Sequence, residues 1–301
     1  MYDIIIIGAG PAGLTAALYA RRAEKNVLVL EKNTFGGQIT HSPRVENYPG
    51  FLKMSGTEFA DKLVEQVLTQ GAEIELDNAT SIEGQPGNYI VKGESGEYNG
   101  KSVIIATGSK HRQLGIEREN DFVGEGISYC AVCDGAFYRD KVVAVVGGGN
   151  TALQEAVMLS DICKKVYVVQ NLEFLTGEIK LQKDIAEKEN VEIILSSVVK
   201  EILGDTEFKG IKITENDEDK YLFVDCVFVA IGQKPENEPF KANVKLNEYG
   251  YILCDESCIP EGKDEGIFVA GDCRTKNIRQ IATAIADGAI AALAACRFIE
   301  K

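Results

Sequence analysis

The sequence contains no tryptophan, two histidines and seven prolines, and no continuous apolar run of the ~18 residues that a transmembrane helix needs. Its start, Met1-Tyr2-Asp3 and then four isoleucines, lacks the basic segment and the small-residue cleavage site of a signal peptide, so we expect none. Basic residues are also few, since 32 of them face 46 acidic residues and give a net charge of −14. Because so acidic a surface repels polyphosphate and anionic lipid, we expect neither a nucleic acid nor a membrane as a partner.

Cysteine is too sparse for a secreted protein held together by disulfides, because eight cysteines are spread over 301 residues. We therefore expect a cytoplasmic protein, in which a close cysteine pair indicates redox chemistry or a metal. The length predicts about two domains. A composition of 45% hydrophobic and 26% charged residues is typical of a folded globular chain and excludes a disordered one.

One short pattern occurs twice along the chain. Its first copy begins with the β-branched run 3–7, continues with GAGPAG at 8–13 and a helical stretch to Arg22, and ends with a second apolar run, 27–30, and Glu31. This order is strand, glycine turn, helix, strand and acid, with the acid 18 residues after the third glycine. It is typical of a dinucleotide-binding unit, in which a carboxylate accepts hydrogen bonds from the ribose hydroxyls of an adenosine.

The second copy has the same elements without the acid. The strand 141–146 is followed by GGGNTA at 147–152, a helix to about Ser160 and a strand over 166–169. The position that corresponds to Glu31 is Gln170. Two such units predict an α/β fold with two Rossmann-like dinucleotide-binding domains, each built on a parallel sheet.

Each glycine of such a turn has a physical reason. The first glycine allows a tight turn, the second lets the backbone approach a pyrophosphate, and the third lets helix and strand pack closely. The N-terminus of the helix then presents free N–H groups and the positive end of its dipole to the phosphates. The alternative is a tight turn that holds no nucleotide, and Glu31 favours a bound nucleotide at the first unit.

Three more buried strands end in small residues, VIIATGS at 103–109, VFVAIG at 227–232 and IFVAGD at 267–272. By itself such a pattern indicates only the end of a strand. Asp272 differs, because it stands between a strand and the alanine-rich helix predicted over Ile281 to Phe298. From the carboxyl edge of a sheet, its side chain could reach a ribitol or a pyrophosphate.

The sequence Cys130-Ala131-Val132-Cys133 precedes Asp134. A C-x-x-C pair is either a redox dithiol or half of a zinc site. Zinc would need two further ligands, and the other cysteines and histidines supply no convincing pair, so we predict a dithiol and no metal. An acid beside a dithiol can hold or pass the proton that thiol exchange requires.

Taken together, these motifs resemble the low-molecular-weight thioredoxin reductase family along essentially the whole chain. They stand in the family's order: GAGPAG at 8–13, GGQIT at 36–40, VENYPGF at 45–51, ATG at 106–108, CAVCDG at 130–135, GGGNTA at 147–152, GD at 271–272 and RQ at 279–280. The resemblance implies a discontinuous FAD-binding domain, residues 1–113 and 242–301, and an inserted nucleotide-type domain, 114–241, that carries the dithiol. It also implies a homodimer, a thioredoxin-type substrate, and an inserted domain that rotates during turnover.

The resemblance further implies roles for individual residues. Cys133 is then the partner of the flavin, Cys130 attacks thioredoxin, and Asp134 is the general acid and base. Glu31 and the first glycine turn would hold the adenosine half of FAD, Asp272 the ribitol, and residues 279–281 the edge of the flavin ring. The residues expected to bind FAD are Gly8, Gly10, Pro11, Ala12, Gly13, Glu31, Gly37, Gln38, Asn47, Ala106, Thr107, Gly108, Gly271, Asp272, Arg279, Gln280 and Ile281.

One departure from the family concerns the electron donor. Members that use NADPH carry a His-Arg-Arg cluster after the second strand of the second unit, whereas residues 170–175 here read QNLEFL and contain no cation. Without those cations the 2′-phosphate loses its charge-assisted hydrogen bonds. We therefore favour the branch of the family that takes electrons from reduced ferredoxin. Two alternatives stay open, the same activity driven by NADPH or NADH, and a non-catalytic redox-sensing flavoprotein.

Overall fold

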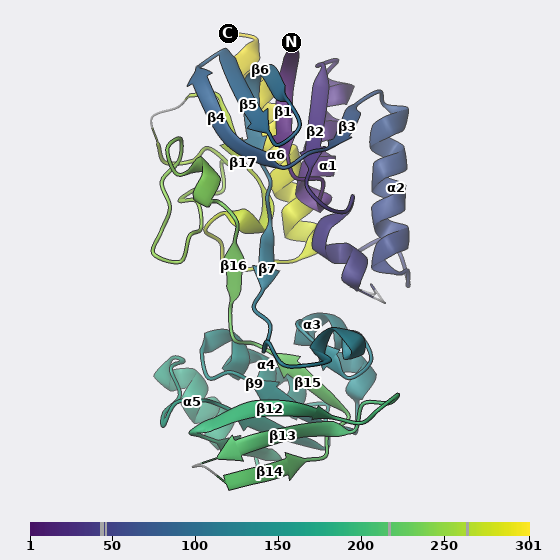
Figure 1. Cartoon of the computed structure of the whole chain (residues 1–301), viewed down its shortest axis with the longest axis vertical. Helices are drawn as coiled ribbons and strands as arrows, with labels where there is room; N and C mark the ends of the chain where they lie inside the picture. The colour runs from purple at the N-terminus through teal and green to yellow at the C-terminus, as the bar shows by residue number, and fades with distance from the viewer. Residues whose placement is uncertain (43–44, 46, 216–217, 263–264) are drawn as a thin grey trace. The chain divides into compact units, whose positions relative to one another are not determined.

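The computed structural model describes residues 1–42, 45, 47–215, 218–262 and 265–301. It divides into two compact units, unit 1 with residues 1–110 and 234–301, and unit 2 with residues 111–233. The chain passes between them twice, through β7 (Ser109–His111) and β16 (Gln233–Pro235), which pair as a two-stranded sheet. Unit 2 is thus inserted into the sequence of unit 1 (Figure 1).

The second boundary lies earlier in the chain than the sequence suggested. The expected domains divide at 113/114 and 241/242, whereas the units divide at 110/111 and 233/234. The reason is the short helix η4 (Glu238–Phe240), because Phe240 is buried in the core of unit 1. No sequence pattern marks this segment as part of the first domain.

Unit 1 is built on a seven-stranded sheet. Five of its strands run parallel in the order β3-β2-β1-β6-β17, and β4 and β5 extend it antiparallel from the first half of β6. Its elements are β1 (Tyr2–Ile7), α1 (Pro11–Arg22), β2 (Val27–Glu31), η1 (Gly37–His41), α2 (Gly56–Thr69), β3 (Glu73–Leu76), β4 (Ala79–Gln85), β5 (Asn88–Gly93), β6 (Glu97–Ile105), β17 (Ile267–Val269), η5 (Gly271–Cys273) and α6 (Ile281–Ile299).

The four isoleucines of β1 are all buried, with 5% or less of each residue exposed. A parallel strand covered on both faces requires this continuous apolar run. Their side chains alternate between two cores, so that Ile4 and Ile6 pack with α1 and α6, while Ile5 and Ile7 pack with β4 and β5. The three layers of a Rossmann-like domain follow from this alternation.

Unit 2 repeats the plan on a smaller scale. A parallel sheet in the order β11-β10-β9-β15-β8 is covered by helices on one face and by the antiparallel sheet β12-β13-β14 on the other. Its elements are η2 (Glu119–Phe122), β8 (Ile127–Ser128), α3 (Ala131–Asp134), η3 (Gly135–Tyr138), β9 (Val142–Val146), α4 (Asn150–Ser160), β10 (Lys165–Val169), α5 (Ile179–Ala186), β11 (Val191–Ile194), β12 (Ser197–Leu203), β13 (Gly210–Glu215), β14 (Glu218–Leu222) and β15 (Cys226–Val229). The predicted α/β class with two Rossmann-like domains is confirmed.

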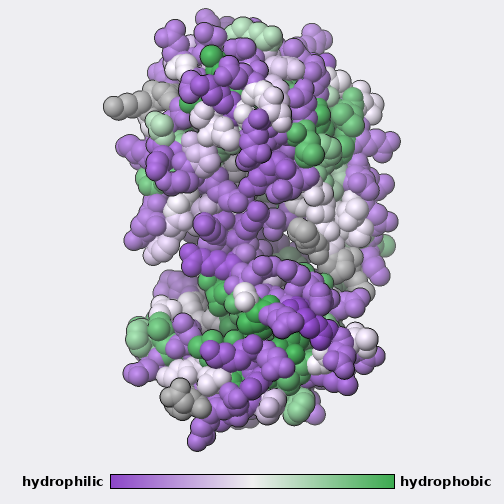
Figure 2. Space-filling view, in the orientation of Figure 1, coloured by the Kyte–Doolittle hydropathy of each residue, from purple (hydrophilic) through white to green (hydrophobic). Residues whose placement is uncertain are grey.

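The last helix, α6, is long and apolar enough to cross a membrane by length and composition alone. In the structure, however, alanines along one side of α6 pack against α1 in the core of unit 1. On the face shown in Figure 2, hydrophilic side chains cover most of unit 1, and hydrophobic side chains gather in the middle of unit 2. The apolar character of α6 is therefore accounted for by a helix–helix core.

Helix α6 also carries a buried carboxylate, Asp287, which is 2% exposed. Its Oδ2 accepts hydrogen bonds from Arg274 Nε at 2.8 Å, Lys276 Nζ at 2.8 Å and the backbone N–H of Gly271 at 2.9 Å. Its Oδ1 accepts one from Arg274 Nη2 at 2.9 Å. This buried charge cluster of Asp287, Arg274 and Lys276 ties the segment after β17 to the middle of α6.

We expect Asp287→Ala to lower the free energy of unfolding by about 3–5 kcal/mol, because two buried cations lose their carboxylate. Burial raises the pKa of Asp287, but hydrogen bonds from Arg274 and Lys276 outweigh it, so the pKa lies below its usual value. A carboxylate with a lowered pKa stabilises the fold above the unfolded pKa of about 3.9, and this stabilisation is lost as the pH falls.

Urea unfolding followed by circular dichroism, at neutral and at acidic pH, measures the destabilisation expected for Asp287→Ala. The difference between parent and variant should shrink as the pH falls below about 4. Asp61→Ala is the control, because Asp61 lies exposed on α2. A difference that stays constant over this range would contradict the role of the carboxylate.

Candidate functional site

The first glycine turn is shaped by two close backbone approaches. A Cβ on Gly8 would lie 2.3 Å from the carbonyl oxygen of Ala106, and a Cβ on Gly13 would lie 1.9 Å from that of Gly8. Gly8 also has a φ of +110°, which L side chains rarely adopt. At Gly10, by contrast, a Cβ would meet no atom within 4 Å. The middle glycine, which caps the N-terminus of α1, therefore faces open space.

Glu31, at the end of β2, is placed at this turn by backbone donors. Its Oε2 accepts the N–H of Ala9 at 2.8 Å and its Oε1 that of Asn33 at 2.9 Å. Each carboxylate oxygen has a second lone pair, so that Glu31 can still accept hydrogen bonds from two hydroxyl groups. Glu31 is 8% exposed and lies beside the opening at Gly10.

The loop after β2 returns to the same turn. The N–H of Gly36 donates to the carbonyl oxygen of Ala9 at 2.8 Å, and a Cβ on Gly37 would lie 3.2 Å from the Cα of Gly10. Gln38 follows on η1 with an exposed side chain. Glu46, in the motif at 45–51, lies outside the described residues.

Three more of the expected residues meet where β6 ends. Ala106 contacts the turn at Gly8, and no atom lies within 4 Å of a Cβ on Gly108. The hydroxyl of Thr107 donates to Asn237 Oδ1 at 2.8 Å. Asn237 is fully buried, and its Nδ2 donates to the carbonyl oxygens of Gly250 and Cys273. Sequence reasoning missed Asn237, because no motif surrounds it.

Asp272 is the clearest sign that unit 1 holds a ligand. Its Oδ1 is buried and finds no hydrogen-bond partner among the residues that the structure describes. Burial raises the pKa of Asp272 to about 6, although the charges of Lys276 and Arg279 oppose the shift. Gly271, which precedes it at a φ of +82°, is held through its N–H by Asp287. A buried acceptor of this kind calls for a hydroxyl donor from a bound molecule.

The residues expected at the flavin ring lie at the start of α6. Gln280 is the N-cap of that helix and forms a capping box with Thr283, and Ile281 is the first helical residue. The Asn47 side-chain amide donates to Gln280 Oε1 at 3.1 Å, which brings together two residues far apart in the sequence. The Arg279 guanidinium lies 4.2 Å from the centre of the Tyr251 ring.

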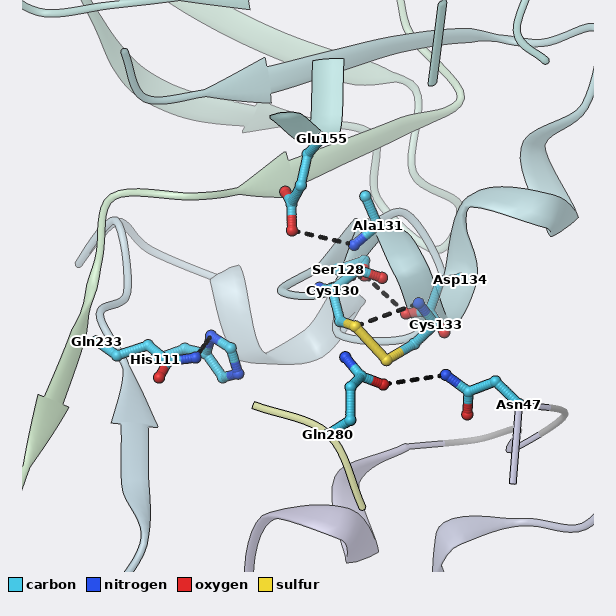
Figure 3. The surroundings of a disulfide bond; sticks show 10 residues. All are labelled: Asn47, His111, Ser128, Cys130, Ala131, Cys133, Asp134, Glu155, Gln233 and Gln280. Carbon is cyan, nitrogen blue, oxygen red and sulfur yellow. Dashed lines mark hydrogen bonds between the residues drawn. A yellow bond between two sulfur atoms is a disulfide. The ribbon is translucent and has the colours of Figure 1, made fainter. Parts of the chain in front are cut away.

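In unit 2, Cys130 and Cys133 form a disulfide with their Cα atoms 5.3 Å apart (Figure 3). Cys130 is the N-cap of α3, and its Sγ accepts the N–H of Cys133 at 3.2 Å. The backbone N–H of Cys130 donates to Ser128 Oγ, whose hydroxyl donates to Asp134 Oδ2 at 2.6 Å. Asp134 is thus linked to the dithiol through Ser128, in a network that the sequence spacing alone does not reveal.

The six other cysteines are buried and not bonded to one another. Cys254 and Cys258, the second close pair in the sequence, have pKa values raised by burial to about 12. A thiol with such a pKa is not a nucleophile at neutral pH. Among the described residues, no three or more histidines, cysteines and acids are grouped as a metal would need.

The second glycine turn has the geometry of the first. The counterpart of Gly10 is Gly149, where a Cβ would meet only Thr176 Oγ1, at 3.7 Å. A Cβ on Gly147 would lie 2.5 Å from the carbonyl oxygen of Ala230, and one on Gly148 would lie 2.5 Å from the side chain of Gln170. Gln170 is 5% exposed, and its Nε2 donates to the carbonyl oxygen of Phe174 at 3.3 Å. Its side chain therefore lies beside Gly148, the counterpart of Ala9, as the side chain of Glu31 does in the first turn.

The segment after β10 returns to this turn, as the segment after β2 does in unit 1. The N–H groups of Thr176 and Gly177 both donate to the carbonyl oxygen of Gly148, at 2.8 and 2.9 Å. At the N-terminus of α4, Asn150 and Glu178 exchange two hydrogen bonds, which places a carboxylate beside this turn. A pyrophosphate bound at this turn would meet the negative charge of Glu178.

We expect Gly10→Ala and Gly13→Ala to separate folding from ligand binding in unit 1. Gly10 has a φ of −76° and room for a methyl group, so Gly10→Ala should keep the parent's thermal stability but lose bound FAD. Gly13→Ala should lower the free energy of unfolding by about 1–3 kcal/mol or more, because its methyl group meets a backbone carbonyl.

Flavin absorbance of the purified proteins and melting of the FAD-free proteins check this pair. Ala9→Gly is the control, because it reports the effect of a methyl group at the same turn. Gly50→Ala would not serve, because Gly50 has a φ of +102°. Full flavin occupancy in Gly10→Ala would show that the backbone at Gly10 does not approach the cofactor.

Comparisons with known proteins agree with this arrangement. A family model for pyridine nucleotide-disulphide oxidoreductases matches residues 2–288. A 34.2 kDa protein in a rubredoxin operon of Clostridium pasteurianum is 42% identical, over 99% of this chain and 97% of that protein. Thioredoxin reductase from Bacillus subtilis is 40% identical, over 100% of this chain and 96% of that protein. The crystal structure of thioredoxin reductase from Streptococcus pyogenes has a TM-score of 0.94 at 39% identity, and covers 100% of this chain and 98% of that one.

Proposed function

Because the chain belongs to the pyridine nucleotide-disulphide oxidoreductases, in the low-molecular-weight thioredoxin reductase family, we propose that it reduces a thioredoxin-type protein with electrons from reduced ferredoxin. The family is FAD-dependent. The observation that carries the donor assignment is the charge around the second glycine turn, where residues 170–175 supply no cation and Glu178 places a carboxylate. We place the protein in the cytoplasm and expect it to act as a homodimer.

The fit of FAD to unit 1 rests on Asp272. Its buried, unpartnered Oδ1 would accept a hydroxyl of the ribitol chain, as the resemblance implies. Glu31 would accept the hydroxyls of the adenosine ribose, and the opening at Gly10 would admit the pyrophosphate. Asn47 and residues 279–281 would border the flavin ring. When bound, FAD supplies a group that accepts electrons one at a time and passes them on as a pair.

The dithiol of unit 2 would perform the exchange with the substrate. The Cys130 thiolate attacks one sulfur of the substrate disulfide, forms a mixed disulfide and releases the other substrate sulfur as a thiolate. The Cys133 thiolate then attacks Cys130 Sγ, which regenerates the protein disulfide and releases the reduced substrate. Two electrons leave the dithiol, and the two protons that complete the substrate thiols leave with them. Asp134, linked to the dithiol by Ser128, is suited to hold one of these protons.

Energetics allow ferredoxin as the donor. Plant-type ferredoxins have potentials near about −400 mV, and that of thioredoxin is about −270 mV. A difference of about 130 mV over two electrons is roughly 6 kcal/mol in favour of reduction, since 30 mV corresponds to about 1.4 kcal/mol. Ferredoxin supplies single electrons, and the substrate disulfide needs a pair, which is the conversion that a flavin provides.

Anaerobic bleaching of the flavin tests the donor. Reduced ferredoxin should remove the absorbance of oxidised flavin, whereas NADPH should bind only with a high-micromolar to millimolar dissociation constant. Each lost charge-assisted hydrogen bond costs about 1.5–3 kcal/mol, so two or three cost at least about two decades of affinity. Full bleaching by micromolar NADPH or NADH would overturn the ferredoxin assignment.

A variant designed to bind NADPH tests the same donor assignment. Asn171→Arg and Leu172→Arg together should restore NADPH binding only in part, because the Glu178 carboxylate stays beside the turn. Adding Glu178→Gln, which removes that charge, should restore more binding in the same titration.

We expect Cys133→Ser to abolish thioredoxin reduction while the flavin remains reducible, because serine is no nucleophile toward a disulfide at neutral pH. Anaerobic titration of the flavin and a coupled insulin-reduction assay measure the two halves separately. Cys226→Ser is the control, since Cys226 is a buried thiol of the same unit. Thioredoxin reduction near the parent rate in Cys133→Ser would place the redox pair elsewhere.

A further inference from the structure

Unit 2 contains a second acid at the dithiol, for which the proposed function has no use. Glu155 lies in the middle of α4, half-buried, and its Oε1 accepts the backbone N–H of Ala131 at 3.3 Å (Figure 3). Ala131 is the residue between Cys130 and Val132 and the first residue of α3. A carboxylate from another helix thus contacts the N-terminus of the short helix that carries the disulfide.

The amides at this N-terminus have two competing acceptors. The Sγ of Cys130 accepts the N–H of Cys133, and Glu155 accepts that of Ala131. Free N–H groups at a helix N-terminus stabilise a thiolate, which is one reason why such cysteines are reactive. A negative carboxylate on a neighbouring amide has the opposite effect on that thiolate. Ionising the Cys130 thiol and the Glu155 carboxyl group at the same time therefore costs free energy.

The surroundings of Glu155 favour the protonated, neutral form of its carboxyl group. Burial raises its pKa to about 7, against the hydrogen bond from Ala131, which lowers it. Helix α4 packs against α3, α5, β9 and β10. The ionisable residues of those elements are Cys133, Asp134, Lys180, Lys183, Asp184, Lys165 and Tyr167. The shift comes from burial and not from any of these charges, so the group is close to half-protonated at neutral pH.

We propose that Glu155 is a positioning residue of the dithiol: it holds the N-terminus of α3 and takes up a proton when Cys130 becomes a thiolate. The proposal rests on the proposed function, which makes Cys130 and Cys133 the redox pair. The exchange is balanced, because the thiol of Cys130 loses one proton and the carboxylate of Glu155 gains one. Water can carry the proton, since the coupling is electrostatic and needs no direct contact.

Glu155→Gln is the informative variant, because its amide oxygen can still accept the N–H of Ala131 but carries no charge. In a Cys133→Ser background, the rate of Cys130 alkylation by iodoacetamide is measured against pH by mass spectrometry. We expect Glu155→Gln to move this profile to lower pH by about one unit, the low end of the effect of a like charge. Glu187→Gln, which alters an exposed acid after α5, should leave the profile unchanged.

A second measurement uses the protein with both cysteines intact. Equilibration in glutathione redox buffers of different pH gives the number of protons taken up per electron pair by the dithiol. This number should change near pH 7 in the parent protein, where Glu155 titrates, whereas in Glu155→Gln it should change only at the lower pH where the Cys130 thiol ionises. Glu155→Ala, which loses both the charge and the acceptor, should also shift the alkylation profile to lower pH and in addition weaken the fixed geometry of α3.

The outcomes separate the two proposals. If the alkylation profile of Glu155→Gln coincides with that of its parent, or moves to higher pH, Glu155 has no electrostatic role at the dithiol. The same conclusion follows if the proton uptake of the intact protein shows no change near pH 7. If Cys130 and Cys133 do not equilibrate with glutathione at all, the proposed function itself fails.

Discussion

After β1 in unit 1 and after β9 in unit 2, the backbone of the turn packs so closely against a neighbouring strand end that no side chain fits. Gly8 and Gly13 let the turn after β1 lie against the carbonyl groups of β6 and of the turn itself, at distances where no Cβ fits. Because the backbone is so close there, α1 begins directly above the sheet and its N-terminus faces the open space at Gly10. Glu31 and Asp272 are both placed at this turn, Glu31 through the N–H of Ala9 and Asp272 through the close approach of Gly271 to Ala12.

Unit 2 shows that the same backbone constraint does not by itself make a ligand site. Gly147 is as tightly packed against Ala230 as Gly8 is against Ala106, so the glycine is required for the fold alone. What differs is the charge around the turn, since Gln170 replaces the acid of the first unit and Glu178 places a carboxylate at the N-terminus of α4. A glycine-rich turn is thus evidence for a strand–helix junction, and its surroundings decide whether it binds a nucleotide.

Much of the fold could be predicted from local patterns. The runs 3–7 and 27–30, the helix after GAGPAG and the helix from Ile281 depend on apolar periodicity and turn chemistry, which a sequence displays directly. The absence of cations at 170–175 is likewise visible in the sequence itself. The carboxylate of Glu178 beside the second turn could not be predicted, because it depends on where the segment 171–178 folds back. Asn237, Asp287 and Glu155 were missed for a similar reason, since each contacts its partners across a long sequence separation.

Two of the missed residues, Asp287 and Glu155, share one physical feature with Glu31, which the sequence predicted. Three carboxylates, Glu31, Asp287 and Glu155, accept a backbone N–H at a turn or a helix end close to a proposed site. Cations at Asp287 keep its pKa low, whereas Glu155 is raised by burial. A chain with a net charge of −14 has acids to spare for such positions, and the local balance of burial and cations decides whether each acid serves as a fixed anchor or as a group that exchanges protons. In this protein the anchors lie in the unit expected to hold FAD, and the acid of intermediate pKa lies beside the disulfide, where proton exchange accompanies the redox reaction.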